Sequence, residues 1–274
     1  MKRILRSKQF LIGFSMLFVV VFLALVGPYL VPHDPYAIDT PNRLQAPSRT
    51  YIFGTDTFGR DIFSRIIVGA RLSLVIGVIA TGVGLLIGGI LGLPAGYFGG
   101  RIDTIICRTI DVFMSFPYLI LALIFIALLG PGLNNAMIAV GISRAPRFAR
   151  LIRGQTMALR NEDFVQSARA IGATPLRIML KHILPNTFSP ILVYTSMSMA
   201  TAILAAAGLG YLGLGAQPPI AEWGAMLSGG RDFLRNAWWM AAFPGAAITF
   251  TIIAFNLLGD GLRDVWDPRL KGRA

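Results

Sequence analysis

The stretch Leu72-Ser-Leu-Val-Ile-Gly-Val-Ile-Ala-Thr-Gly-Val-Gly-Leu-Leu-Ile-Gly-Gly-Ile-Leu-Gly92 decides the fold class. It belongs to a run of 29 residues, between Arg71 and Arg101, that contains no charged side chain. A helix needs about 20 apolar residues to cross the hydrocarbon core of a bilayer. The stretch therefore predicts a transmembrane helix.

Four further stretches lack Asp, Glu, Lys and Arg. They cover residues 10–30, 112–143, 182–221 and 236–259, and they hold 21, 32, 40 and 24 residues. The turn signal Gly130-Pro131-Gly132 divides the second of them. We therefore predict an all-α polytopic membrane protein with six transmembrane helices, near Phe10–Leu30, Leu72–Gly92, Val112–Leu129, Asn134–Leu151, Pro190–Ala207 and Trp239–Leu258.

The composition of the 274 residues supports this class. Hydrophobic residues make up 55% and charged residues only 14%, against about 25% charged in a typical soluble domain. Disordered chains are poor in apolar residues, and a single cysteine excludes a disulfide scaffold. One Cys and two His are too few for a structural zinc site of the usual kind.

The net charge of +12 would suggest a nucleic-acid partner if it were spread over a soluble surface. The predicted spans give another explanation, because 18 of the 25 Lys and Arg fall on the side that holds both termini and 7 on the other. The positive-inside rule then places both termini in the cytoplasm. Net charge is +11 inside and +1 outside.

The first span begins like a secretory signal, with four basic residues before it. Its apolar run exceeds the 7–15 residues of a signal h-region, and no A-x-A-like site ends it. We expect an uncleaved first transmembrane helix. The chain then divides into a cytoplasmic N-terminus (1–9), a first helix (10–30), an external loop (31–71), a five-helix core (72–258) and a cytoplasmic tail (259–274).

The external loop ends in Asp61–Leu74, where the apolar residues fall on one helical face and Arg60, Ser64, Arg65 and Arg71 on others. An amphipathic helix at the outer surface and an extension of the second span both fit this pattern.

The long cytoplasmic connection after the fourth span predicts two short helices. Asn161 is a suitable N-cap for the first, and Gly172 ends it. Pro175 suits the first turn of the second, and Pro185 is expected to close it. The basic end of the fourth span, at Arg144 and beyond, is expected to snorkel to the interface.

Small residues recur every four positions in the second span. This stripe lets helices approach closely in lipid, and we favour internal packing over a dimer interface. The stripe consists of Ala80, Gly84, Gly88, Gly92 and Gly96.

The sequence lacks the motifs of several kinds of binding and catalytic site. The sequence holds no G-x-x-x-x-G-K-[ST] and no H-E-x-x-H, so neither ATP binding by a P-loop nor this zinc chemistry is expected. Coupled carriers place acids or His at mid-membrane, and the spans contain almost none. We expect no catalytic residue, no metal and no cofactor bound by this chain.

Part of the cytoplasmic connection carries a family resemblance. Glu162-Asp-Phe-Val-Gln-Ser-Ala-Arg-Ala-Ile-Gly172, followed by His182-Ile-Leu-Pro-Asn186, resembles the EAA loop of bacterial ABC importer permeases. In that pattern Glu-Ala-Ala is followed by three residues, Gly, nine residues and Ile-x-Leu-Pro. Ala168, Gly172, Leu184 and Pro185 match it, while Gln166, Ser167 and His182 depart from it.

Three other stretches indicate which group of permeases the chain resembles. They are Gly54–Leu74, Gly213–Gly224 and Asn256–Arg269. Together they are similar to the "C" subunits of the dipeptide/oligopeptide/nickel permease group, which have six spans and the type I ABC importer permease fold.

The resemblance implies a multi-pass permease of the bacterial inner membrane that works inside a larger complex. Its partners would be a second permease, two ATP-binding cassette subunits that use ATP and Mg, and a substrate-binding protein outside. Residues 162–186 would be the coupling segment that docks into an ATPase, with Asp34–Arg71 and Gly208–Trp238 as outer contacts. The residues implied for coupling are Gln166, Ser167, Ala168, Gly172, Ala173, Leu184 and Pro185.

The resemblance leaves the cargo open among dipeptides, oligopeptides, glutathione, nickel chelates and opines. Two other classes compete with an importer permease. One is an autonomous secondary carrier or channel, and the other is a structural membrane subunit of a respiratory or similar complex.

Overall fold

A computed structural model describes residues 7–266 of the protein. The basic residues predicted for the cytoplasmic face at positions 2, 3, 6, 269, 271 and 273 lie outside this range. Within it the fold is all-α, as predicted, with no β-strand. The α-helices are α1 (Lys8–Val26), α2 (Ile62–Phe98), α3 (Gly100–Met114), α4 (Tyr118–Leu129), α5 (Leu133–Leu159), α6 (Asp163–Ala170), α7 (Pro175–Ile178), α8 (Leu184–Asn186), α9 (Phe188–Tyr211), α10 (Trp223–Gly230) and α11 (Trp239–Trp266).

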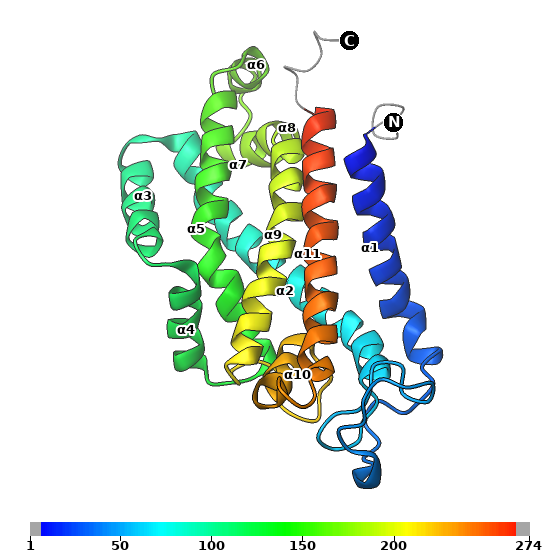
Figure 1. Cartoon of the computed structure of the whole chain (residues 1–274). Coiled ribbons are helices and arrows are strands. Elements are labelled where there is room, and N and C mark those ends of the chain that lie inside the picture. The colour runs from blue at the N-terminus through cyan, green and yellow to red at the C-terminus, as the bar shows by residue number, and fades with distance from the viewer. Residues whose placement is uncertain (1–6, 267–274) are drawn as a thin grey trace.

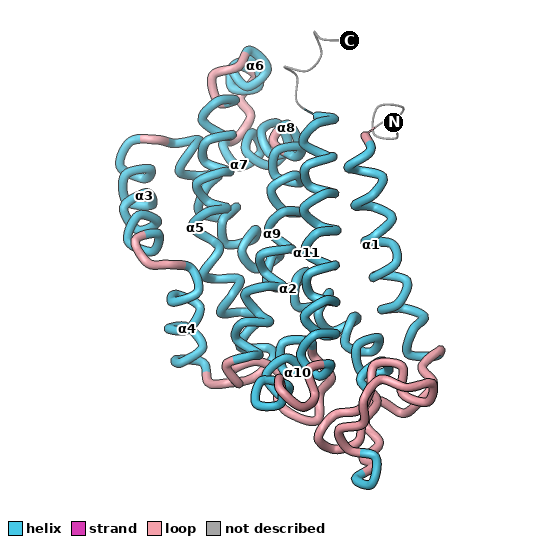
Figure 2. The backbone as a smooth tube through the Cα atoms, viewed as in Figure 1, coloured by secondary structure: helices cyan, strands magenta, loops and turns pink. Residues whose placement is uncertain are grey.

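The long helices form one bundle (Figure 1). The two ends of the described chain lie at the same end of the bundle as α6, α7 and α8, and α10 lies at the opposite end. Figure 2 shows that the longest loop, between α1 and α2, also lies at the α10 end. Helices α3 and α4 together run alongside α5.

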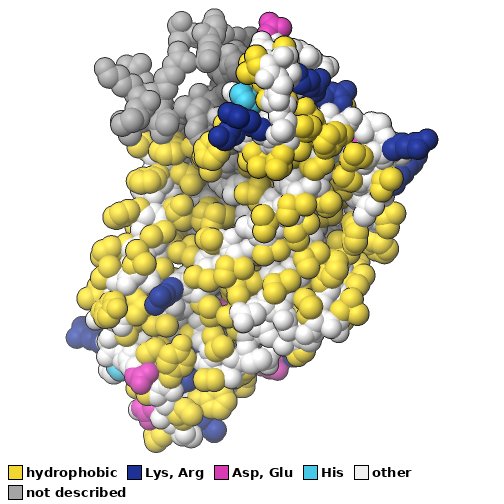
Figure 3. Space-filling model, turned by 180° about the vertical axis from the view of Figure 1, so that it is seen from behind, with side chains coloured by type: hydrophobic (Ala, Val, Ile, Leu, Met, Phe, Trp, Pro, Cys, Tyr) yellow, Lys and Arg dark blue, Asp and Glu magenta, His cyan; other side chains and the backbone are white. Residues whose placement is uncertain are grey.

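Four described helical segments are long and apolar enough to cross a membrane, and α3 with α4 would make a fifth. Helix α5, with 27 residues, is also long enough to cross a membrane, but its arginines make it less apolar than these segments. The face seen in Figure 3 carries a broad band of hydrophobic side chains, with charged side chains mainly at its two ends. Such a band is typical of contact with lipid or with another membrane subunit.

The third predicted span is wrong as a single helix. Helices α3 and α4 meet at an angle of 93°, and the break falls at Ser115–Pro117. Pro117 has no backbone N–H, and it disfavours helical geometry at the preceding residue. Helix α3 therefore ends before the proline. It begins at Gly100, whereas the predicted span starts at Val112.

The structure also separates the two alternatives for Asp61–Leu74. Helix α2 is continuous from Ile62, so this segment is an extension of the second span, and a separate amphipathic helix is wrong. Asp61 caps the helix by accepting a hydrogen bond from the backbone N–H of Ser64 at 3.0 Å. Ser64 and Arg65, expected on polar faces, are buried because the loop between α1 and α2 folds over them.

The connection between α5 and α9 has the predicted helix–turn–helix order with two differences. Glu162, not Asn161, is the N-cap residue of α6, and Gly172 turns the chain with φ +80°. Pro175 opens α7 as expected, but Pro185 does not end the helical run. One π-helical turn at Met179–Ile183 leads into α8. Pro185 lies in the first turn of α8, where a backbone N–H would have no partner within the helix in any case.

The small-residue stripe of α2 lies directly against α5. A Cβ added at Gly92 would lie 2.5 Å from the carbonyl oxygen of Ala149, and one at Gly96 would lie 2.6 Å from that of Arg153. On the other side of the contact, a Cβ at Gly141 of α5 would lie 2.6 Å from the Cβ of Val83. The two backbones therefore touch, and the stripe serves packing within the chain.

We expect Gly92→Ala to lower the melting temperature of the purified protein in detergent. The added methyl group must push the α2 and α5 backbones apart, and overpacking of this kind costs about 1–3 kcal/mol. Gly82→Ala is the matched control, because a Cβ there meets nothing within 4 Å. It should leave stability unchanged or raise it slightly. Equal melting temperatures for the two variants would contradict the contact.

Candidate functional site

The docking segment, defined as residues 162–186, is fixed to the bundle by one face of α6. Val165 and Ala168 are buried on this face. They pack in an apolar cluster that joins α6 to α2, α5 and the start of α9 and consists of Leu93, Tyr97, Ile152, Val165, Ala168, Ile178, Met179, Ile183 and Ile191.

A second contact ties α6 to the end of α2. The guanidinium of Arg169 lies over the ring of Tyr97, 5.1 Å from its centroid, and its Nε donates a hydrogen bond to the Tyr97 hydroxyl at 3.4 Å. Tyr97 is itself buried. The segment is therefore attached to the helix that packs closely on α5, and a displacement of α6 would reach α2 directly.

The opposite face of the docking segment is exposed in the part of the chain that the structure describes. Of the residues implied for coupling, Gln166, Ser167, Gly172 and Pro185 are exposed, Ala173 and Leu184 are half-buried, and only Ala168 points inward. Four large apolar residues outside that set are also exposed, most of all Ile171 at 84% and Leu176 at 63%. The sequence pattern does not single them out, because apolar residues in a short helix are equally compatible with burial. Exposed apolar side chains beside polar ones mark an interaction surface.

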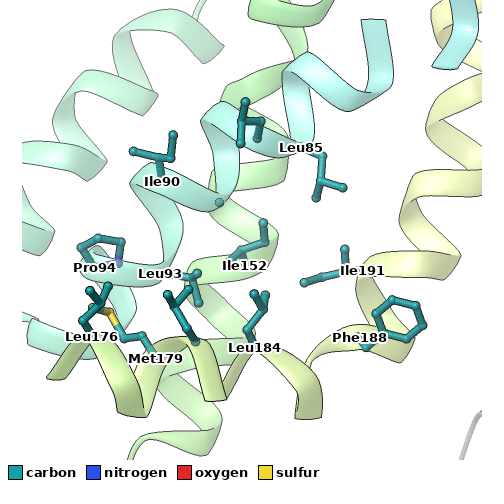
Figure 4. Close-up of a pocket in the computed structure, with 13 residues that line it drawn as sticks. Leu85, Ile90, Leu93, Pro94, Ile152, Leu176, Met179, Leu184, Phe188 and Ile191 are labelled. Carbon is teal, nitrogen blue, oxygen red and sulfur yellow. The ribbon is translucent and has the colours of Figure 1, made fainter. Parts of the chain in front are cut away.

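Next to the docking segment lies an apolar groove of about 560 Å³ between α2 and the residues that lead into α9 (Figure 4). Leu85, Ile90 and Leu93 line it from α2, and Leu184 and Phe188 face them. A peptide needs hydrogen-bonding partners for its backbone and termini. The side chains that line the groove supply none, so the groove is not a site for polar cargo.

Helix α5 turns a charged side away from α2. Arg147 is exposed and lies over the ring of Tyr118 at 5.3 Å, while Arg150 pairs with Asp111 of α3 at 2.5 Å. One turn further on, Arg153 pairs with Asp103. Charged side chains in membrane helices face a bundle interior or a water-filled cavity. We call the surface formed by α3, α4, α5 and α9 the charged face. Its charged side chains come from α3 and α5, and they indicate a polar environment on this side of the bundle.

Arg144 departs from the expected snorkelling. Its side chain is buried, and its Nη2 donates a hydrogen bond to the Thr201 hydroxyl of α9. The hydroxyl provides a polar partner on the neighbouring helix, so the Arg144 side chain turns toward α9 and does not extend to the interface.

At the other end of the bundle, the two outer segments named from the resemblance pack on each other. Arg65 donates to the carbonyl oxygens of Pro35 and Pro219. The indole N–H of Trp239 donates to the carbonyl oxygen of Thr55 at 3.2 Å. A cavity of about 140 Å³ lies between the segments. We call this assembly the outer cap.

Glu222 stabilises the outer cap from within. Its carboxylate accepts hydrogen bonds from the backbone N–H groups of Gly224 and Ala225, both at 2.8 Å, and thereby caps α10. Burial raises the pKa of this carboxyl, against the effect of the two hydrogen bonds. The residue has a structural role in the cap, since both oxygens are used within α10.

The described part of the chain brings no three His, Cys, Asp or Glu side chains together in a way that would hold a metal ion. The thiol of Cys107 donates to Asp103 at 3.2 Å. Its neighbours are the Asp103–Arg153 pair of the charged face.

Comparison with known families identifies the fold. Residues 84–272 match the family described as binding-protein-dependent transport system inner membrane component. Residues 1–47 match the N-terminal transmembrane domain of oligopeptide transport permease C.

Individual relatives agree with this match. The chain is 45% identical to a dipeptide transport system permease protein of Alkalihalophilus pseudofirmus, over 98% of the chain and 89% of the relative. It is 46% identical to a glutathione transport system permease protein of Pectobacterium atrosepticum, over 93% and 86%. Among solved structures, the MetNI methionine ABC transporter in an inward-facing conformation shares the fold, with a TM-score of 0.61 at 19% identity over 75% of this chain and 98% of that one.

Proposed function

We propose a cargo and a coupling route for this chain, which belongs to the family of binding-protein-dependent transport system inner membrane components. It is a multi-pass permease subunit of an ABC importer in the inner membrane, and ATP hydrolysis belongs to separate subunits. Membership of this family decides against an autonomous carrier and against a subunit of a respiratory complex.

The proposed cargo is a short peptide or a related solute. The relatives at 45% and 46% identity are named for dipeptide and for glutathione transport. The charged face suits such polar cargo, since it offers arginine side chains and the hydroxyl of Thr201 along one side of the bundle. A binding protein on the outer cap would release the cargo onto this face, and a second permease would complete the path.

The main observation in support of the coupling proposal is that one face of the docking segment is packed in the bundle while the other is exposed. Val165 and Ala168 anchor one face of α6 in the bundle, and the other face presents Gln166, Ser167 and Ile171 to the exterior. A segment of this kind can seat in a groove of an ATPase subunit and move with it. The residues proposed to contact the ATPase are Gln166, Ser167, Gly172, Ala173, Leu184 and Pro185, with Ala168 as an anchor.

Coupling then works through rigid packing. Closure of two ATPase subunits around ATP and Mg would displace the docking segment. The apolar cluster and the Arg169–Tyr97 contact would pass the displacement to α2. Because α2 and α5 touch along their backbones, α5 would move with α2, and the charged face would open to the other side of the membrane.

We further propose that the chain crosses the membrane six times with both termini in the cytoplasm. The deciding helix is α5, whose 27 residues span about 40 Å. Near its start, the N–H of Gly132 donates to the carbonyl oxygen of Leu214, next to the outer cap. At its other end, Leu159 packs against the cluster of the docking segment. Helix α5 thus links the two ends of the bundle.

We expect Pro131→Cys and Gln166→Cys, each in a Cys107→Ser background, to label on opposite sides of the membrane. Both positions are exposed. A membrane-impermeant maleimide should modify the first in intact spheroplasts and the second only after permeabilisation. Modification of both from the same side would mean that α5 does not cross, and six crossings would be wrong.

We expect Gly172→Asp to reduce ATP-driven uptake by the assembled importer about tenfold or more, or to release the ATPase during purification. A side chain there enters open space, and Asp tolerates positive φ better than most residues. The fold of this chain should therefore survive, while a new charge enters the proposed contact.

The matched control is Gly100→Asp at the start of α3, an exposed glycine outside the docking segment that also has a positive φ (+53°) and whose added side chain also enters open space. It should leave uptake and assembly unchanged. If Gly172→Asp also retained normal uptake and a full complement of ATPase, the docking role of the segment would be refuted.

A further inference from the structure

Arg144 is a cation in the middle of the helix bundle with most of its hydrogen-bonding groups unused. The residue is 4% exposed. One guanidinium nitrogen, Nη2, donates to Thr201, while Nε and Nη1 are buried and have no partner in the structure. Burying a charged group without partners is costly. In a membrane helix, such a residue marks a site for a group that supplies the missing partner.

No described acid is available to neutralise Arg144. The two acids of α3 that face α5 are already paired, Asp103 with Arg153 and Asp111 with Arg150. None of the ion pairs within residues 7–266 includes Arg144. The titratable groups around it are two tyrosines and another cation, namely Tyr118, Tyr194 and Arg147.

The surroundings of Arg144 favour an anion. Arg147 lies one turn along α5, is exposed on the charged face and stacks over Tyr118. A small hollow of about 30 Å³ beside Arg147 is lined by Tyr118, Ser143 and the turn between α3 and α4. Thr201, the partner of Arg144, is exposed. Arg147, the hydroxyl of Thr201 and the phenol of Tyr118 thus border the charged face, and the buried guanidinium of Arg144 is bonded to that hydroxyl. Donors of this kind hold a carboxylate well.

We propose that Arg144, assisted by Arg147, forms a subsite in the translocation path that binds a carboxylate of the cargo as it passes. The inference rests on the proposed function and makes it more specific. Dipeptides and glutathione, for which the relatives are named, share a free carboxylate. The subsite holds that group against the bundle while the path changes its opening, and it needs no contact with the peptide side chains.

The test uses the complete importer reconstituted in liposomes with its binding protein and a labelled dipeptide. Arg144→Leu should lower the uptake rate about tenfold, the loss expected when a charge-assisted hydrogen bond is removed. Arg144→Lys keeps the charge and should retain most of the rate. Arg263→Leu is the control, because it removes an exposed arginine near the end of α11, a helix that does not form the charged face.

The melting temperature distinguishes a cargo subsite from a structural role of Arg144. If Arg144 forms a cargo subsite, replacing this unpaired buried charge by leucine should leave the melting temperature of the complex unchanged or raise it. ATPase stimulation by the loaded binding protein should persist. Loss of uptake together with a lower melting temperature would show that Arg144 only maintains the fold. Normal uptake by Arg144→Leu would overturn the subsite while leaving peptide import intact.

A binding measurement separates the cargo carboxylate from a free anion. Saturation-transfer NMR on the detergent-purified complex, without binding protein, should show the dipeptide bound more strongly than its C-terminal amide. In Arg144→Leu the two should become equal. If the wild-type complex bound acid and amide equally and chloride competed with both, Arg144 would hold a free anion and the proposal would fail. A wild-type importer that moved no peptide at all would refute the proposed function instead.

Discussion

Glycines on α2 bring its backbone so close to that of α5 that a methyl group at Gly92 would collide with the Ala149 carbonyl oxygen. This contact fixes how α5 is rotated about its axis. The side of α5 that meets α2 carries small and apolar residues, including Phe148 and Ile152. Because a helix has 3.6 residues per turn, Arg147 and Arg150 must then point away from α2. The position of the charged face follows from the packing of two helices.

The same pair of helices connects the two ends of the molecule. At the docking end, Tyr97 of α2 lies under Arg169 and Ile152 of α5 packs in the apolar cluster. At the other end, the first turns of α2 are held by the outer cap, where Trp223 donates to the carbonyl oxygen of Ile66. A movement at one end can therefore pass along α2 and α5 to the other end without crossing a flexible loop. This is the mechanical property that the proposed coupling requires, since the ATPase and the binding protein are proposed to contact opposite ends of the bundle.

The sequence predicts what depends on local composition. Runs without charges locate α1, α2, α9 and α11, and Gly172 locates the turn in the docking segment. What it misses depends on distant partners. The inward turn of Arg144 requires Thr201, 57 residues away, and the outer cap requires contacts such as Trp239 with Thr55, 184 residues apart. The break before Pro117 is a local signal, but an apolar run of ordinary span length conceals it.

The most direct measurement concerns water at the charged face. In the assembled importer with Cys107→Ser, we would compare the rates at which a charged methanethiosulfonate modifies Thr201→Cys, on the charged face, and Val78→Cys, an exposed position of α2. Thiols react as thiolates, which form only where water reaches them. If α5 and α9 border an aqueous path, Thr201→Cys should react roughly tenfold faster or more. Equally slow modification of both positions would contradict a hydrated path along this side of the bundle.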